Sequence, residues 1–171
     1  MHALKLPAAA LIQRLRSDSE LLPALAQAHC TEWGYLRPKA SLERTQARLM
    51  RMCDSSDMPA VFIIKQRQSL VASVTLDRCD YLDAQSGRTP FVTGVYVAPE
   101  FRGQGLARVL MEHIEGEAHA RGFAALHLDC MPQHESLYSH LGYTAICVRT
   151  DRCKFKMTLM VKNISHGSNN G

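Results

Sequence analysis

The stretch from Val95 to Leu110, VYVAPEFRGQGLARVL, constrains the fold of this chain more than any other. It opens as a β-branched strand, turns at Pro99 and passes through a glycine-rich hinge directly into an apolar helix. Such a strand-to-helix connection is typical of an α/β fold. The first amides of a helix have no partner within the helix, and Gly103 and Gly105 leave the backbone open to close approach. The hinge therefore predicts either a socket for phosphate oxygens or a tight turn whose glycines serve packing alone.

Two familiar phosphate-binding motifs do not fit this hinge. The dinucleotide motif G-x-G-x-x-G/A requires a small residue where this chain has Arg108, and it normally follows the first strand of a domain. The P-loop requires Gly-Lys-Ser/Thr, which does not follow Gly105. A phosphate site here would therefore be of another kind.

Hydrophobic periodicity predicts strands and helices along the rest of the chain. Predicted strands cover 9–16, 60–65, 70–76, 91–97, 124–129, 143–148 and 153–161, and the pair 60–65 and 70–76 forms an antiparallel hairpin. Predicted helices cover 19–33, 41–52, 105–121 and 133–141, with a polar loop over 77–90. The pattern favours one domain over residues 1–164, followed by a polar, disordered tail over 165–171.

Composition excludes several classes of function. The net charge of +4 is mild and the basic residues are scattered, so we expect no nucleic-acid partner. The six cysteines form no Cys-x-x-Cys pair and no His-Glu-x-x-His is present, so we expect no metal. The N-terminal apolar run is too short to span a membrane and lacks a cleavage pattern. We therefore expect a cytoplasmic protein with reduced thiols and no membrane partner.

Two segments together resemble a known family. Arg102-Gly-Gln-Gly-Leu-Ala107 matches the Arg/Gln-x-x-Gly-x-Gly/Ala signature of the GNAT family of N-acetyltransferases, and Ser136–Tyr143 is similar to the family's Leu-Tyr-x-x-x-Gly-Phe segment. The resemblance covers about residues 8–162. It implies the GNAT acyl-CoA N-acyltransferase fold, an α/β architecture with a mixed, mostly antiparallel sheet of about seven strands flanked by four helices.

The resemblance also implies how a donor is held. Acetyl-CoA would be the cosubstrate, its pyrophosphate on the hinge amides and its pantetheine arm beside strand 91–97. In this family that strand diverges from the next, which here is 124–129, and opens a slot for the thioester. The residues so assigned to coenzyme A are Val95, Tyr96, Val97, Arg102, Gly103, Gln104, Gly105, Leu106 and Ala107.

Acetyl transfer requires a proton for the leaving thiolate and a neutral amine. Tyr138 matches the family's tyrosine beside the sulfur, where a phenol can donate a proton to the thiolate. The alternative is an aromatic ring that only packs beneath the sheet. The glutamate that many relatives carry on the strand before the hinge is absent, so His127 and Asp129 are the candidate bases. The missing base slightly favours an α-amine, which is far more often neutral near pH 7 than a lysine amine is.

The first two predicted helices and their connection line the acceptor side in this family. Trp33, Tyr35 and Arg37 could form a substrate lip there, unless Trp33 only anchors the helix end. Arg37, Lys39 and Arg44 favour an acidic acceptor.

The Trp33-Gly34 pair, the His-Leu-Gly-Tyr ending at 140–143 and the missing strand glutamate resemble, loosely, the branch that contains actin N-terminal acetyltransferases. We therefore expect an N-acetyltransferase acting by direct attack on a primary amine, either of a protein N-terminus or of a small molecule. An aminoglycoside or polyamine acetyltransferase and a non-catalytic acyl-CoA-binding regulatory module are the alternatives. A homodimer is open as well, because late strands in this family often pair between subunits.

Overall fold

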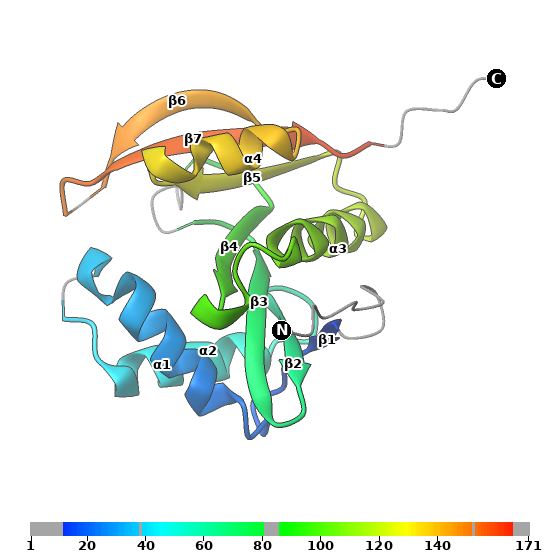
Figure 1. Ribbon diagram of the computed structural model, residues 1–171. Helices are drawn as coiled ribbons and strands as arrows, with labels where there is room; N and C mark the ends of the chain where they lie inside the picture. The colour runs from blue at the N-terminus through cyan, green and yellow to red at the C-terminus, as the bar shows by residue number, and fades with distance from the viewer. Residues whose placement is uncertain (1–11, 38, 81–85, 152, 166–171) are drawn as a thin grey trace.

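The computed structural model describes residues 12–37, 39–80, 86–151 and 153–165 (Figure 1). Its centre is a 7-stranded sheet in the order β1-β2-β3-β4-β5-β7-β6. Neighbouring strands run antiparallel except for β4 and β5, which are parallel. The strands are β1 (Ile12–Arg14), β2 (Ala60–Gln66), β3 (Ser69–Asp77), β4 (Phe91–Val97), β5 (Ala125–Cys130), β6 (Thr144–Thr150) and β7 (Lys156–Asn163). The mixed, mostly antiparallel sheet predicted from the sequence is confirmed.

Helices cover both faces of the sheet because alternate residues of its strands point to opposite sides. Val61 and Ile63 of β2 pack with α1 (Leu22–Trp33) and α2 (Leu42–Cys53) in one core. Phe62 and Ile64 belong to a second core with α3 (Leu106–Ala120), beside which lies α4 (Glu135–His140). Figure 1 shows α1 and α2 together at one end of the molecule, with α3 and α4 beside the later strands.

The helix starts follow local capping chemistry. The Ser41 hydroxyl accepts a hydrogen bond from Arg44 N at 3.2 Å, as the sequence predicts for α2. Helix α1 begins at Leu22 rather than at Ser19, because residues 19–21 form a turn in which Ser19 Oγ accepts from Leu21 N and Pro23 takes its favoured place in the first helical turn. Helix α3 begins after Gly105, whose φ of +80° suits glycine.

Two predicted strands are shorter than expected. In the described residues β1 ends at Arg14, and residues 9–11 of the predicted strand lie outside the described part, as do 81–85 of the loop and 166–171 of the tail. Strand β7 begins at Lys156 rather than at Cys153. The cause is a turn in which Asp151 Oδ1 accepts hydrogen bonds from the amides of Cys153 and Phe155, at 2.9 and 2.8 Å.

The sheet opens at its middle, between β4 and β5. These strands pair only at Phe91 with His127 and at Val92 with Leu128. Beyond Val92, the β3–β4 register also shifts by one residue, because β4 carries a bulge that includes Gly94 at a φ of +59°. The predicted divergence of the two strands is confirmed.

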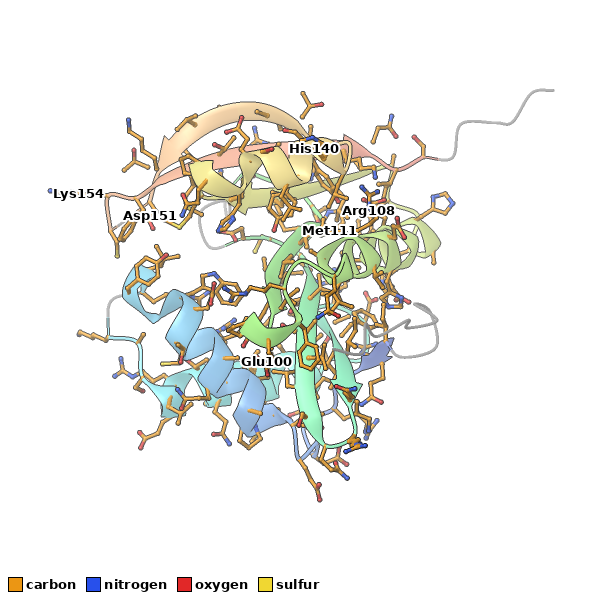
Figure 2. All side chains as sticks on the ribbon, viewed as in Figure 1. Glu100, Arg108, Met111, His140, Asp151 and Lys154 are labelled. Carbon is orange, nitrogen blue, oxygen red and sulfur yellow. The ribbon has the colours of Figure 1, made fainter. Side chains whose placement is uncertain are left out.

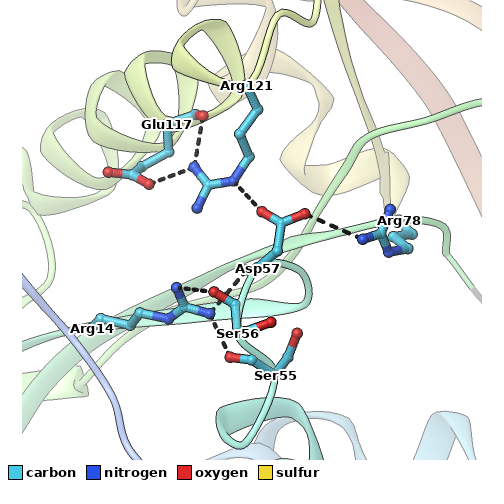
Figure 3. Close-up of polar contacts among 7 residues, drawn as sticks. All are labelled: Arg14, Ser55, Ser56, Asp57, Arg78, Glu117 and Arg121. Carbon is cyan, nitrogen blue, oxygen red and sulfur yellow. Dashed lines mark hydrogen bonds and ion pairs between the residues drawn. The ribbon is translucent and has the colours of Figure 1, made fainter.

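A network of charged side chains joins the loop after α2 to β1 and to the ends of β3 and α3 (Figure 3). Arg121, which directly follows α3, donates to the Asp57 carboxylate at 2.9 Å, and Arg78 pairs with the same carboxylate at 3.2 Å. Arg14 of β1 donates to the carbonyls of Ser55 and Asp57 at 2.8 and 2.9 Å. The loop after α2 is thereby tied to both an edge strand and α3.

The edge strand β6 is exposed along most of its length, including Ile146 and Val148. Its open edge leaves room for the homodimer that the sequence leaves open, which stays a prediction. In the described part of the chain, no helix has the length and apolar character that crossing a membrane requires.

Candidate active site

The hinge between β4 and α3 exposes its backbone. A short turn (Pro99–Phe101) follows β4, and Gly103 and Gly105 then adopt φ values of +75° and +80°. A Cβ added at either glycine would meet no atom of the described residues within 4 Å, so space lies beside this backbone. Within the described part of the chain, no side chain caps the start of α3. Its first amides are therefore available to an anion, in the stretch that Glu100 and Arg108 bracket in Figure 2.

A cavity of ≈ 690 Å³ runs from this hinge along β4 and past the ends of β5 and α1. Most residues predicted to bind coenzyme A line it, namely Val95, Tyr96, Val97, Arg102, Gly103, Gly105, Leu106 and Ala107. Gln104 is not among the lining residues, and its amide lies 3.5 Å from the Glu100 carbonyl. The hinge and the opening in the sheet thus belong to one continuous space.

Arg102 joins the hinge to helix α1. Its Nε donates to the Val97 carbonyl at 2.9 Å, and its Nη2 lies 3.1 Å from the Glu32 carboxylate. Both partners of the ion pair are partly exposed, so an incoming anion can compete with Glu32 for the guanidinium.

Tyr138 enters the cavity from α4 beside Cys130 of β5. Its ring packs edge-on to Tyr143 at 6.2 Å and also contacts the core under the sheet. Burial raises the pKa of Tyr138 above its ordinary value, so the phenol keeps its proton near neutral pH. Burial likewise raises the pKa of Cys130 to about 12, which leaves a thiol in place of a nucleophilic thiolate.

The two bases proposed from the sequence lie in different settings. His127 is not a lining residue; its Nδ1 is 3.3 Å from the Pro90 carbonyl and its ring packs on Phe91. Asp129 does line the cavity, but its carboxylate binds both Nε and Nη2 of Arg149. Asp129 therefore lies at the cavity in an ion pair, whereas His127 is outside the set of residues that line it.

The residues predicted for the acceptor gather at the end of α1. Trp33, Tyr35 and Arg37 all line the cavity. Trp33 is only partly buried and lies edge-on to His29 at 4.8 Å and to Tyr96 at 6.5 Å. Trp33, the last residue of α1, thus contacts β4 through Tyr96.

Contacts beside this end of the cavity join the segment after α1 to Met131 and to the β6–β7 turn. The Tyr35 hydroxyl lies 3.3 Å from Met131 Sδ, and the Tyr35 ring meets Phe155 edge-on at 5.4 Å. The Cys153 thiol donates to the Leu36 carbonyl at 3.3 Å. Figure 1 shows the end of α1 beneath the β6–β7 turn, which Asp151 and Lys154 mark in Figure 2. Tyr35 and Met131 therefore partly cover this end of the cavity.

Two further lining residues, His29 and Arg48, are absent from the sequence-based prediction. The Arg48 guanidinium is half-buried and contacts Met52 Sδ at 3.3 Å. Burial, with the charges of Arg37 and Arg51, lowers the pKa of Arg48 to about 10 against the opposing effect of Asp77, so Arg48 remains a cation at neutral pH. This end of the cavity therefore carries the cations Arg37 and Arg48.

The sequence between residues 22 and 143 matches the model of the acetyltransferase (GNAT) family, well over half of the chain. The chain belongs to the GNAT family. The family model that matches is one of acetyltransferases, so this GNAT protein is an acetyltransferase. In its described residues, no group of three or more His, Cys, Asp or Glu side chains is arranged to hold a metal ion.

Solved GNAT structures share the fold. An aminoglycoside 6'-N-acetyltransferase complexed with coenzyme A has a TM-score of 0.72 at 14% identity, over 93% of this chain and 99% of that one. An N-acetyltransferase from Staphylococcus aureus has a TM-score of 0.71 at 15% identity, over 91% and 98%. A spermidine/spermine N-acetyltransferase from Vibrio cholerae has a TM-score of 0.66 at 16% identity, over 90% and 92%. These identities are low, so the likeness establishes the fold and leaves the acceptor open.

One curated relative is similar over a shorter segment. Mouse N-alpha-acetyltransferase 80 is 50% identical over 54 residues, which are 30% of this chain and 16% of that protein. The matched segment therefore spans only a small part of that relative.

Proposed function

We propose that this GNAT enzyme transfers the acetyl group of acetyl-CoA to the α-amine of an acidic acceptor such as a protein N-terminus. The transfer is direct, within a complex that holds both substrates. The choice of acceptor rests on the end of the cavity beside α1, which carries Arg37 and Arg48 and is partly covered by Tyr35. We call it the acceptor end.

The hinge suits the coenzyme A pyrophosphate. The exposed amides from Arg102 to Ala107 and the open space beside Gly103 and Gly105 fit phosphate oxygens at a helix start. Beyond Val92, β4 has no ladder partner on its β5 side among the described residues, so backbone groups at Val95 and Val97 would pair there with the pantetheine amides. The Val97 carbonyl would then share its bond from Arg102 Nε with the pantetheine. Arg102 would exchange Glu32 for a phosphate when the coenzyme binds.

The two substrates would approach from opposite faces of the sheet. Val92 and Val95 of β4 pack in the core with α3, on the side of the hinge. Tyr96 pairs across the strands with Ser73, which pairs in turn with Ile63 of the α1–α2 core. The gap between β4 and β5 connects the two faces, so donor and acceptor can meet there.

The chemistry needs a hydrogen-bond donor at the sulfur and an unprotonated amine. As the new N–C bond forms and the C–S bond breaks, Tyr138 would give its proton to the leaving sulfur and recover one from solvent. The amine nitrogen would lose its own proton to water in the cavity. Cys130 stays a thiol, so an acetyl-cysteine route is disfavoured.

Charge at the acceptor end distinguishes the candidate acceptors. Arg37 and Arg48 line the cavity, and the acidic lining residues Glu32 and Asp129 are in ion pairs with Arg102 and Arg149. A polycation such as a polyamine or an aminoglycoside would meet like charge there, whereas an acidic segment would be attracted. Because the contacts of Tyr35 with Met131 and Phe155 partly cover this end, a narrow, extended acceptor fits better than a wide one. The name of the mouse relative, an N-alpha-acetyltransferase, is in keeping with this choice.

A panel of acceptors tests the proposal. Thiol release from acetyl-CoA is measured with peptides that begin with acidic, neutral or basic residues, and with spermidine and an aminoglycoside. We expect kcat/KM to be greatest for the acidic peptides and to fall about tenfold for them, but not for neutral peptides, in Arg48→Gln. Preference for spermidine or the aminoglycoside would reject the proposed acceptor.

A further inference from the structure

His29 lies where α1 crosses the bulge of β4, and the chemistry described so far does not use it. The residue is 5% exposed and lines the cavity. A Cβ added at Gly94 would come within 2.9 Å of His29 Cε1, so the ring presses directly on the bulge. Because β4 leaves β5 just before Gly94, His29 stands beside the gap through which the two substrates would meet.

A hydrogen-bond chain fixes the tautomer of His29. The Ser73 hydroxyl donates its one proton to the Gly94 carbonyl at 3.0 Å. His29 Nε2 is 3.2 Å from the same hydroxyl oxygen and must therefore supply the proton of that second contact. The Nδ1 atom of His29 is then unprotonated and carries a lone pair.

The Nδ1 lone pair has access to the cavity. Among the described residues, Nδ1 of His29 has no hydrogen-bond partner. A fully enclosed side-chain nitrogen or oxygen without a partner occurs in these residues at His113 Nε2 and not at His29 Nδ1. Nδ1 of His29 is thus not fully enclosed, and the open space that His29 borders is the cavity. Burial, with the positive charges of Arg48 and Arg37, lowers the pKa of His29 to about 3, which keeps this lone pair free of a proton.

We propose that His29 binds the acceptor amine: Nδ1 accepts a hydrogen bond from an amine N–H and holds the nitrogen at the gap between β4 and β5. The inference rests on the proposed function for the position of the donor. It adds His29 as an acceptor-binding residue, in a role separate from that of the candidate bases His127 and Asp129. The Ser73–Gly94 chain then has a role, since it orients the imidazole so that Nδ1 is presented to the substrate.

Two substitutions separate this role from a merely structural one. In His29→Asn an amide oxygen takes the place of Nδ1, while the contact with Ser73 is lost. In His29→Gln the amide nitrogen takes the place of Nε2 and keeps the contact with Ser73, while the acceptor at Nδ1 is lost. Binding of coenzyme A and the circular dichroism spectrum are recorded for each variant as a check on folding.

We expect His29→Gln to lose about tenfold more kcat/KM than His29→Asn, the loss typical of one hydrogen bond to substrate. Equal activities, or a more active Gln variant, would overturn the inference and leave His29 a support for the bulge. The comparison uses whichever amine the wild type acetylates, so failure of the proposed acceptor is a separate result.

A second measurement uses the wild-type protein and does not depend on the variants folding. Side-chain nitrogen NMR of His29 is recorded with coenzyme A alone and then with an acceptor peptide added, so that no acetyl transfer occurs. We expect a neutral ring protonated at Nε2 and a shift of the Nδ1 resonance when the peptide binds. An Nδ1-protonated ring, or an Nδ1 resonance that the bound peptide leaves unchanged, would overturn the inference.

Discussion

The buried imidazole of His29 makes a quantitative prediction about stability and pH. Burial and the charges of Arg48 and Arg37 lower its pKa from 6.5 to about 3 in the folded protein. Above pH 6.5 the ring is neutral in the folded and in the unfolded chain, so it makes no pH-dependent contribution. As pH falls below 6.5, only the unfolded chain takes up a proton at this position, and the folded state loses stability until the pH nears 3.

The size of the effect follows from the two pKa values. Between pH 8 and pH 5 the free energy of unfolding should fall by about 2 kcal/mol on account of His29, and by about 4 kcal/mol on reaching pH 3. His29→Asn and His29→Gln both remove the titrating group. The stability difference between wild type and either variant should therefore shrink by about 2 kcal/mol from pH 8 to pH 5.

Urea unfolding of the three proteins at pH 8, 7, 6 and 5 measures this difference. All other titrating groups are common to the three chains, so their contributions largely cancel. The two variants act as controls for each other, because their absolute stabilities can differ while their pH trends must agree. A wild-type-minus-variant difference that stays constant across the pH range would refute the burial of a neutral His29.

Three further substitutions test other parts of the site. Tyr138→Phe should lower kcat by about a hundredfold while coenzyme A binding, measured by calorimetry, is kept; full activity would remove Tyr138 as the proton donor. Gly94→Ala should cost about 2 kcal/mol in urea unfolding, because its φ of +59° and the 2.9 Å approach of a new Cβ to His29 both oppose a side chain, and an unchanged stability would contradict this packing. Arg102→Ala should weaken coenzyme A binding about tenfold, whereas Glu32→Gln should strengthen it slightly because it frees the Arg102 guanidinium. If both substitutions weaken binding equally, Glu32 does not compete with the phosphates for Arg102.

The fold was predictable because local signals and the overall pattern agree. The Ser41 cap, the glycines at the start and end of α3, and the β2–β3 hairpin all lie where the sequence indicates. The errors lie at element ends that are set by the hydrogen bonds of single side chains. The last strand starts late because the Asp151 carboxylate holds a turn, and a single Asp gives no periodic signal.

The donor half of the site was easier to predict than the acceptor half. Coenzyme A binding uses backbone groups, and the glycines that expose them leave a compact motif in the sequence. His29 and Arg48, by contrast, come from two different helices and meet only through packing against β3 and β4. In the sequence each occupies an ordinary helical position. Only the structure brings Arg48 beside Arg37, and His29 against Gly94.

The most direct test of the central claim is mass spectrometry of an acidic peptide incubated with the enzyme and acetyl-CoA. The peptide should carry an acidic N-terminus and one internal lysine, so that both kinds of amine compete in one molecule. The proposed function predicts a single acetyl group on the N-terminal nitrogen, in step with thiol release, and much less product from a matched peptide with a basic N-terminus. Acetylation of the lysine instead, or equal modification of both peptides, would contradict the account.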